Sequence, residues 1–478
     1  MNELLTKSAT ELAESIRKKD VSPLEVVDVH IKRIEEVNDK INAVVVKTFD
    51  QARELAKNAT EKLAHSAPED LPPFFGVPCT IKDTYAVKGL PWAGGVVRRR
   101  NVIADFDATV VKRIKDAGAI ILGKTNIPEA AMWCETYNKV YGRTKNPHDT
   151  SRTTGGSSGG EGAIIAAGAS PFGPGSDIGG SIRYPAFFNG VIGHKPSSNI
   201  VPQTGHWPPA PGETAQYMVC GPLARRVKDC IELLKIFAGP DGIDPNTIDR
   251  PLEDPYSVKL KDVKVYYFYD NGLSHAHEDV RLAVRKAVDA LEDLGLNVEP
   301  WTPPGINRGL EIWFASLGLG GGETFMDLVG GGDKINLWKE WGKMIFGKSD
   351  HTFPILGMMT IEALSSGSKE KLRPLYEKGK QLQKIVEEKL GANSVLICPP
   401  YNRAAPKHSG PWLSFLAISY SATFNILGLP ATVVPIYWNE KGLPVGVQVL
   451  GSRFSDHLTL AVGRALEEAY GGWRPASI

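Results

Sequence analysis

The spacing of apolar positions divides the first third of the chain into short helices and buried strands. Ser8-Ala-Thr-Glu11 and Ser22-Pro-Leu-Glu25 both fit the capping-box pattern that opens a helix, and an apolar stripe follows the second. Short uncharged apolar runs indicate buried strands between the helices. Helices are predicted over residues 9–19, 23–37, 49–65 and 108–117, and strands over 76–82 and 119–122.

The alternation returns at the C-terminal end after a stretch of different texture. Residues beyond about 305 are rich in glycine between Gly318 and Gly332, and aromatic side chains cluster between Trp313 and Phe353. Further on, strands are predicted over 431–436 and 445–450, followed by a helix over 455–469.

This order of elements predicts an α/β fold built as one large domain, residues 1–478, with a mixed twisted sheet between layers of helices. The domain divides into four parts by composition. These are N-terminal helices (1–70), a segment with two glycine loops (71–240), a variable aromatic-rich segment expected on the substrate side (305–395), and a return to the sheet (396–478).

The composition is that of a globular protein, with 42% hydrophobic and 23% charged residues. Lysine plus arginine number 55 and aspartate plus glutamate 54, so nucleic acid is not an expected partner. Five scattered cysteines without a CxxC pair favour a reducing, cytoplasmic location. The N-terminus lacks an apolar leader, and the uncharged run 409–439 contains too many breakers for a membrane span, so a buried helix, a turn at 428–430 and a strand are expected there.

Three residues form the sharpest candidate for chemistry: Lys82, Ser157 and Ser181. Each serine lies in a glycine loop, and Gly179-Gly180 ahead of Ser181 lets backbone amides converge on one oxygen, as an oxyanion hole requires. A serine hydroxyl needs a base, and no histidine lies inside either loop. Lys82 ends an apolar run, so burial would lower its pKa and allow it to act as that base.

A second interpretation starts from Gly155-Gly-Ser-Ser-Gly159, which fits the Gly-x-Ser-x-Gly nucleophile elbow of α/β-hydrolases. Ser157 would then be the nucleophile of an esterase, with His457 and Asp456 downstream in the order that fold requires. Adjacent residues do not easily form the aspartate–histidine hydrogen bond, and the second glycine loop would have no role. His457 then remains as a packing or capping residue at a helix start.

The motifs resemble those of the amidase signature family. The similarity rests on Lys82, Gly155-Gly-Ser-Ser-Gly-Gly-Glu161 and Gly175-Ser-Asp-Ile-Gly-Gly-Ser-Ile-Arg183, and it continues through Gly193-His-Lys-Pro196. Met132-Trp-Cys-Glu135 and Asp456-His-Leu-Thr-Leu460 are most similar to fatty acid amide hydrolases. The resemblance is strong over 70–240, extends over 395–478 and is weak over 240–390.

The resemblance implies a Ser–cis-Ser–Lys triad. Ser181 would be the nucleophile, Ser157 the bridging serine after a cis peptide bond, and Lys82 the base. The oxyanion hole would be formed by the backbone amides of Ile178, Gly179, Gly180 and Ser181. Around these, we expect Ser158, Ser176, Asp177 and Arg183 to hold the loops in place.

The function that follows is hydrolysis of a carboxylic amide, with a fatty or aryl acyl group, to acid and amine through an acyl-enzyme. No metal or organic cofactor is expected. Two further alternatives remain: an amidase-type subunit of a transamidation complex, and a non-catalytic lipid-binding scaffold. Integral fatty acid amide hydrolases carry an N-terminal hydrophobic span, and this chain shows none.

The aromatic-rich residues 313–359 allow three interpretations: an apolar acyl pocket, a homodimer interface, or a surface in peripheral contact with a membrane. Lysines beside Trp338 and Trp341 favour the last, although a solvated basic face gives the same pattern. Met132 and Trp133 are predicted substrate-binding residues because they precede the first glycine loop.

Overall fold

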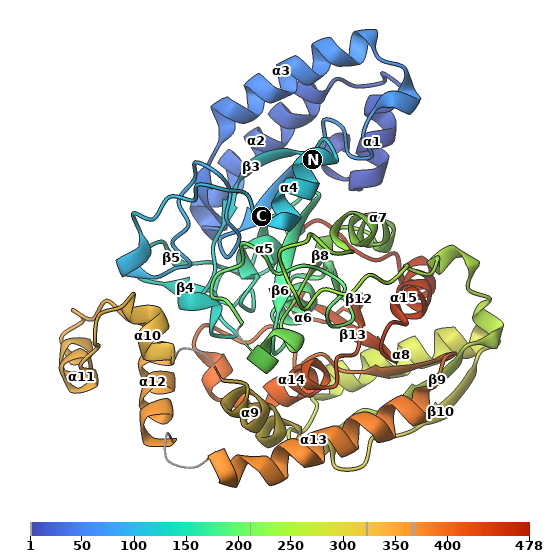
Figure 1. Ribbon diagram of the computed structural model, residues 1–478. Helices are drawn as coiled ribbons and strands as arrows, with labels where there is room; N and C mark the ends of the chain where they lie inside the picture. Colours follow the sequence, from blue (N-terminus) through green and yellow to red (C-terminus); the bar gives the residue numbers. More distant parts are fainter. Residues whose placement is uncertain (1, 211, 322–323, 366–368) are drawn as a thin grey trace.

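A large mixed sheet forms the centre of the computed structural model, which describes residues 2–210, 212–321, 324–365 and 369–478 (Figure 1). Its eight strands follow the order β10-β9-β11-β13-β12-β7-β8-β6. Strands β9, β10 and β11 are parallel, and the remaining pairs are antiparallel. The strands are β6 (Phe172–Asp177), β7 (Ile192–Lys195), β8 (Val219–Ala224), β9 (Lys264–Tyr267), β10 (Asn297–Pro300), β11 (Ser394–Cys398), β12 (Ala431–Trp438) and β13 (Pro444–Gly451).

Helices cover both faces of this sheet. Thr432 of β12 contacts Thr459, whereas Gln448 of β13 faces the other way and contacts Arg183. Thr459 belongs to α15 (Asp456–Tyr470) and Arg183 to α6 (Arg183–Asn189), so these two helices lie on opposite faces. Helix α7 (Val227–Phe237) and helix α8 (Glu278–Asp293) pack against α15, and α5 (Gly159–Ala166) packs against α6. The predicted fold class, helices around a mixed sheet, is confirmed.

A separate three-stranded sheet holds the strands predicted early in the chain. Its order is β1-β3-β2, with bounds β1 (Val44–Lys47), β2 (Pro78–Lys82) and β3 (Ile120–Thr125). Strand β2 packs beside β6, the edge strand of the large sheet, without hydrogen-bonded pairing between them. This contact brings Lys82, the last residue of β2, to the last residues of β6. A short hairpin, β4 (Tyr137–Asn138) and β5 (Gly142–Arg143), lies further along the chain.

The N-terminal helices form where the pattern predicts them. Both capping boxes are present: the Ser8 and Ser22 side chains accept from the amides of Glu11 and Glu25, whose carboxylates bond back. Helix α2 continues to Ile41, beyond the predicted end at residue 37, because Val37 and Ile41 extend its buried stripe. The bounds are α1 (Ala9–Arg17), α2 (Pro23–Ile41), α3 (Phe49–His65) and α4 (Thr109–Asp116). The run 409–439 contains buried helix α14 (Ser419–Ile426) followed by β12, as expected.

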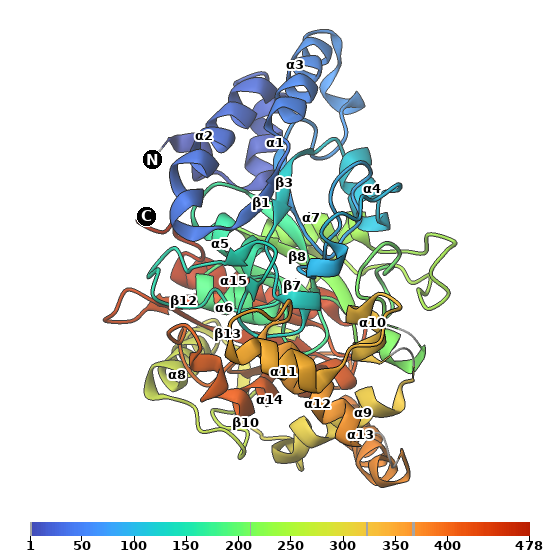
Figure 2. The ribbon, with the colours of Figure 1, turned by 90° about the vertical axis from the view of Figure 1, so that its left-hand side faces the viewer.

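The aromatic-rich segment is helical and divides into two parts. Helices α9 (Gly309–Leu319) and α13 (Lys369–Leu390) pack together beside α14. Helices α10 (Phe325–Gly330), α11 (Leu337–Ile345) and α12 (Phe353–Ser365) stand at the edge of the molecule, in gold and orange (Figures 1 and 2). They share a small core of their own, while the Phe325 side chain lies outside the described residues. Within the described ranges, no helix has both the length and the apolarity to cross a membrane.

Candidate active site

The Lys82 side chain is fully buried at the end of β2. Its Nζ lies 2.8 Å from Ser157 Oγ, 2.9 Å from Ser176 Oγ and 3.3 Å from the Ser176 carbonyl oxygen. Burial lowers the pKa of Lys82 to about 7, although the negative charge of Asp177 opposes this shift. A substantial fraction of Lys82 is therefore neutral near pH 7 and able to accept a proton.

The first glycine loop holds Ser157 beside Lys82. The Gly156–Ser157 peptide bond is cis, as the resemblance implied. Gly156 packs so closely beneath Trp133 that an added Cβ would lie 2.3 Å from the Trp133 carbonyl oxygen. Helix α5 begins two residues later, and the Ser158 amide donates to the Ser181 carbonyl oxygen at 3.2 Å. This bond joins the two glycine loops.

The second glycine loop is organised by the Asp177 carboxylate. The Gly180 amide donates to Asp177 Oδ1 at 2.7 Å, and the Ile182 amide donates to Oδ2 at 3.0 Å. Arg183 Nη2 and Asn425 Nδ2 also donate to Oδ1, each at 2.9 Å. Burial alone would raise the pKa of Asp177, but the Arg183 guanidinium outweighs it and holds that pKa below its usual range. The expected supporting roles of Asp177 and Arg183 agree with these contacts.

The remaining supporting residues behave differently from one another. Ser176 contacts Lys82 directly instead of only fixing the loop. Ser158 acts through its backbone, because its hydroxyl has no hydrogen-bond partner in the described part of the chain. Neither behaviour follows from the sequence pattern.

The amides expected to form an oxyanion hole are not all available. The Gly180 N–H is already donated to Asp177, which corrects its expected place among the donors. The amides of Ile178, Gly179 and Ser181 remain as candidates. Trp313 Nε1 donates to the Ile178 carbonyl oxygen at 2.7 Å and so fixes one peptide of this loop. Ser181 itself is partly exposed, whereas Lys82 and Ser157 are buried.

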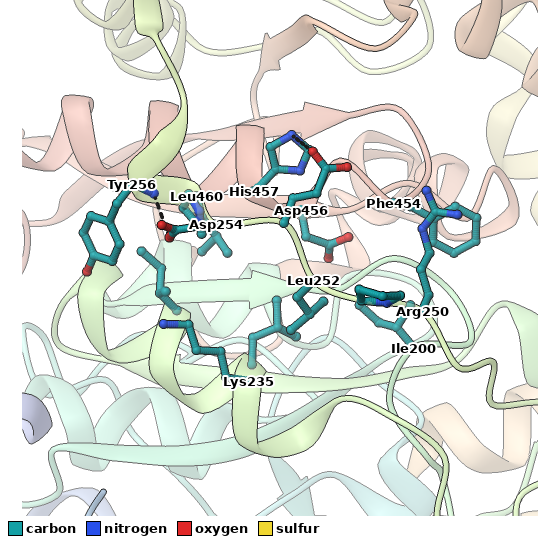
Figure 3. A pocket seen from close by; sticks show the side chains of 15 residues that line it. Ile200, Lys235, Arg250, Leu252, Asp254, Tyr256, Phe454, Asp456, His457 and Leu460 are labelled. Carbon is teal, nitrogen blue, oxygen red and sulfur yellow. Dashed lines mark hydrogen bonds and ion pairs between the residues drawn. The ribbon is translucent and has the colours of Figure 1, made fainter.

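The nucleophile-elbow interpretation is not supported by the structure. Asp456 lies on the α15 face of the sheet, where its carboxylate contacts His194 at 3.2 Å and Ser197 Oγ at 2.5 Å. His457 lines a pocket of about 350 Å³ together with Glu253, whose carboxylate is 3.3 Å away (Figure 3). Ser157 precedes α5 on the opposite face, so the sheet separates it from both residues.

A row of aromatic rings runs outward from the second glycine loop. Trp313 lies against Gly179, where an added Cβ would come within 3.0 Å of its ring. Trp133 is part of this row, so the predicted segment lies beside both loops. Met132 packs instead with the small core of α10–α12. Successive ring centroids are 4.9 Å apart for Trp313–Phe314, 6.1 Å for Phe314–Phe415, 6.1 Å for Phe415–Trp133, 4.1 Å for Trp133–Trp412 and 5.0 Å for Trp412–Phe353.

Two residues at the site have no recognisable signal of function in the sequence. Glu161 is buried with its carboxylate accepting from Thr80 Oγ1 at 2.6 Å and Thr125 Oγ1 at 2.9 Å, and burial raises its pKa to about 8. His206 lies 25 positions beyond Ser181, yet its Nε2 is 2.8 Å from Ser176 Oγ. Only the fold brings these groups to Lys82.

Comparison with known proteins assigns the class. The chain matches the amidase family model over residues 25–460 and belongs to that family, the amidase signature enzymes. It is an amide-hydrolysing enzyme. Human fatty-acid amide hydrolase 2 is 39% identical, over 98% of this chain and 90% of the relative. The amidase-type subunit of the glutamyl-tRNA(Gln) amidotransferase of Caldanaerobacter subterraneus subsp. tengcongensis is 33% identical, over 98% of this chain and 97% of the relative.

Solved structures agree with the fold. A 6-aminohexanoate cyclic dimer hydrolase superposes with a TM-score of 0.84 at 26% identity, covering 100% of this chain and 99% of the other. A bacterial aryl acylamidase superposes with a TM-score of 0.83 at 24% identity, covering 98% and 97% of the two chains. The second likeness concerns the fold alone.

Proposed function

We propose that this enzyme cleaves carboxylic amides through a Ser181–Ser157–Lys82 relay. The observation that carries the proposal is the buried Lys82 amine, 2.8 Å from the Ser157 hydroxyl, with its pKa lowered to about 7 by burial. A lysine in this state is a base at neutral pH, which supplies what a serine nucleophile otherwise lacks. The Ser158–Ser181 backbone hydrogen bond supports placing both serines at one centre.

The reaction begins when neutral Lys82 takes the Ser157 proton while Ser157 takes the Ser181 proton. Ser181 Oγ then bonds to the amide carbon, and the carbonyl electron pair moves to oxygen, stabilised by the amides of Ile178, Gly179 and Ser181. As the pair returns, the C–N bond breaks, and Ser157 protonates the departing amine with a proton returned by Lys82. Water, deprotonated through the same relay, releases the acid and restores Ser181.

The proposed substrates carry an apolar acyl group, in the range from aryl to fatty. The row of rings from Trp313 to Phe353 starts at Gly179 and continues beside Trp133, so an acyl chain leaving the glycine loops would meet aromatic side chains. Pockets for such ligands are mainly apolar with a few polar groups at the reacting end. The name of the human fatty-acid amide hydrolase 2 relative agrees with this choice.

Peripheral membrane contact is a further proposal about how such substrates are reached. On α11, Trp338, Ile345 and Phe346 are 87%, 81% and 77% exposed, beside Lys339 and Lys343. Exposed apolar side chains flanked by lysines are typical of interfacial helices. Vesicle co-sedimentation with and without anionic lipid tests this proposal, and analytical ultracentrifugation tests the homodimer interface instead.

Transamidation is the competing function, because a glutamyl-tRNA(Gln) amidotransferase component is also a relative. The two functions separate in one experiment with purified chain alone. Hydrolysis of an acyl anilide and labelling by a fluorophosphonate, both lost in Ser181→Ala, support the hydrolase. Activity that appears only with two co-purifying chains supports the amidotransferase, and inertness to both substrate and label supports a binding protein.

A further inference from the structure

The loop that carries His206 is fixed against the residues that follow Lys82. The Ala86 amide donates to the Gly205 carbonyl oxygen at 2.9 Å, and the Trp207 amide donates to the Thr84 carbonyl oxygen at 2.8 Å. The Tyr85 ring meets the His206 ring edge-on, with centroids 5.4 Å apart. His206 is only 8% exposed, so its ring has one defined position beside Ser176.

The partners of His206 decide where its proton lies. Nδ1 is 2.8 Å from the Pro208 carbonyl oxygen, which can only accept a hydrogen bond, so Nδ1 carries the hydrogen. Burial, followed by the nearby Lys82 charge, lowers the pKa of His206 to about 3, so the ring is neutral and has one N–H. Nε2 is therefore an acceptor, and the Ser176 hydroxyl 2.8 Å away donates to it.

This assignment fixes the hydrogens of the neutral Lys82 amine. The Ser176 hydroxyl has used its single hydrogen on His206, so its oxygen, 2.9 Å from Lys82 Nζ, presents only lone pairs. The Ser176 carbonyl oxygen, at 3.3 Å, is also an acceptor. The two N–H groups of the neutral amine point to these oxygens, which leaves its lone pair for Ser157 Oγ at 2.8 Å.

We propose that His206 is a positioning residue: by accepting the Ser176 hydroxyl, it prevents that hydroxyl from donating to Lys82 and reserves the Lys82 lone pair for Ser157. The proposal rests on the proposed function of Lys82 as the base. Without the His206 acceptor, the Ser176 hydroxyl turns and competes with Ser157 for the same lone pair. His206 touches neither the substrate nor the reacting atoms in this scheme.

The central test compares His206→Phe with His206→Gln, using kcat and KM for an acyl anilide. Phenylalanine keeps the ring but has no acceptor, so kcat should fall about tenfold, the factor of one ordinary hydrogen bond, with KM unchanged. Glutamine offers a carbonyl oxygen to Ser176 and should restore most of kcat. Equal activity in all three proteins, or equal loss in both variants, would overturn the proposal.

A double-mutant cycle asks whether the effect passes through Ser176. Ser176→Ala removes the hydroxyl that competes, so adding His206→Phe to it should change kcat by less than about twofold. A further tenfold loss in the double variant would show that His206 acts elsewhere. As a matched control, His30 is also buried, with Nδ1 bonded to the Val26 carbonyl oxygen at 2.7 Å. An equal loss of kcat in His30→Phe would also count against the proposal.

Failure of this proposal can be told apart from failure of the proposed function. Lys82→Ala is measured in the same assay, with thermal unfolding of each variant as a check on folding. If Lys82→Ala is inactive while folded His206→Phe has full activity, only the positioning role of His206 is wrong. If Lys82→Ala keeps its activity, Lys82 is not the base and both proposals fall.

Discussion

Lys82 and Asp83 are adjacent in the chain, yet their side chains belong to different clusters. Lys82 Nζ contacts Ser157 and Ser176, whereas Asp83 pairs with Lys124 at 2.7 Å in a fully buried ion pair. Neighbouring strand residues point to opposite faces, so the Asp83 charge is matched by Lys124. This separation allows burial to lower the pKa of Lys82, as a base requires.

Removing the Lys82 amine should abolish most amide turnover. We expect Lys82→Ala to lower kcat/KM by at least about 10³-fold, the scale on which serine enzymes lose rate with their activating base. Steady-state hydrolysis of an acyl anilide measures the loss. Retained activity in Lys82→Ala, combined with loss in His457→Ala, would contradict the relay.

The pH dependence should report the protonation of Lys82. The protonated amine cannot accept the Ser157 proton, so kcat/KM should rise with pH through about 7 and then level off. Lys195 is the matched control, because burial lowers its pKa to about 7 as well, while its Nζ donates to the Leu429 carbonyl oxygen at 2.6 Å. Lys195→Met should keep the same acid limb, and a lost limb would assign it to Lys195.

Covalent labelling should identify Ser181 as the nucleophile. It follows Gly179-Gly180 and is partly exposed, whereas Ser157 is buried against Lys82. Peptide mapping after fluorophosphonate treatment should place the adduct on the segment 176–183. An adduct on 155–160 would instead make Ser157 the nucleophile.

Turnover should increase with the length of the acyl chain. Each buried methylene contributes about 0.8 kcal/mol, so four further carbons along the row of rings should raise kcat/KM by roughly two orders of magnitude. A series from acetyl to dodecanoyl anilides, with detergent below micelle formation, measures this slope.

Two variants locate the chain-length effect. Phe314→Ala, within the row, should flatten the slope, while Trp338→Ala on exposed α11 should leave it unchanged. A flat profile in the unchanged enzyme would mean that the rings do not line the acyl site.

The Asp177–Arg183 pair should be important for stability as well as for the loop. Both side chains are fully buried and 2.9 Å apart, and Asp177→Asn leaves the Arg183 charge without its partner. Such losses cost about 3–5 kcal/mol in free energy of unfolding, measurable by urea denaturation. Asp116→Asn breaks the exposed Lys112–Asp116 pair and should change little. A similarly small change for Asp177→Asn would refute the role of the pair.

The local elements could be predicted because they depend on neighbours in the chain. The capping boxes at Ser8 and Ser22 set helix starts within a few residues, and alternating apolar runs placed β2, β12 and β13. The helix ends were less certain, since α2 extends to Ile41 through packing of distant side chains. The division into two sheets has no local signal, because it depends on which strand edges pair.

The sequence by itself determined the chemistry available: a lysine after an apolar run and two serines in glycine loops, with motifs that identify the family. Only the tertiary structure decided which groups meet. It packed β2 against β6, so Lys82 reached Ser157 and Ser176, committed the Gly180 amide to Asp177, and brought His206 to Ser176. The physical reason is that burial and hydrogen-bond direction depend on atoms far apart in the chain, which residue spacing does not encode.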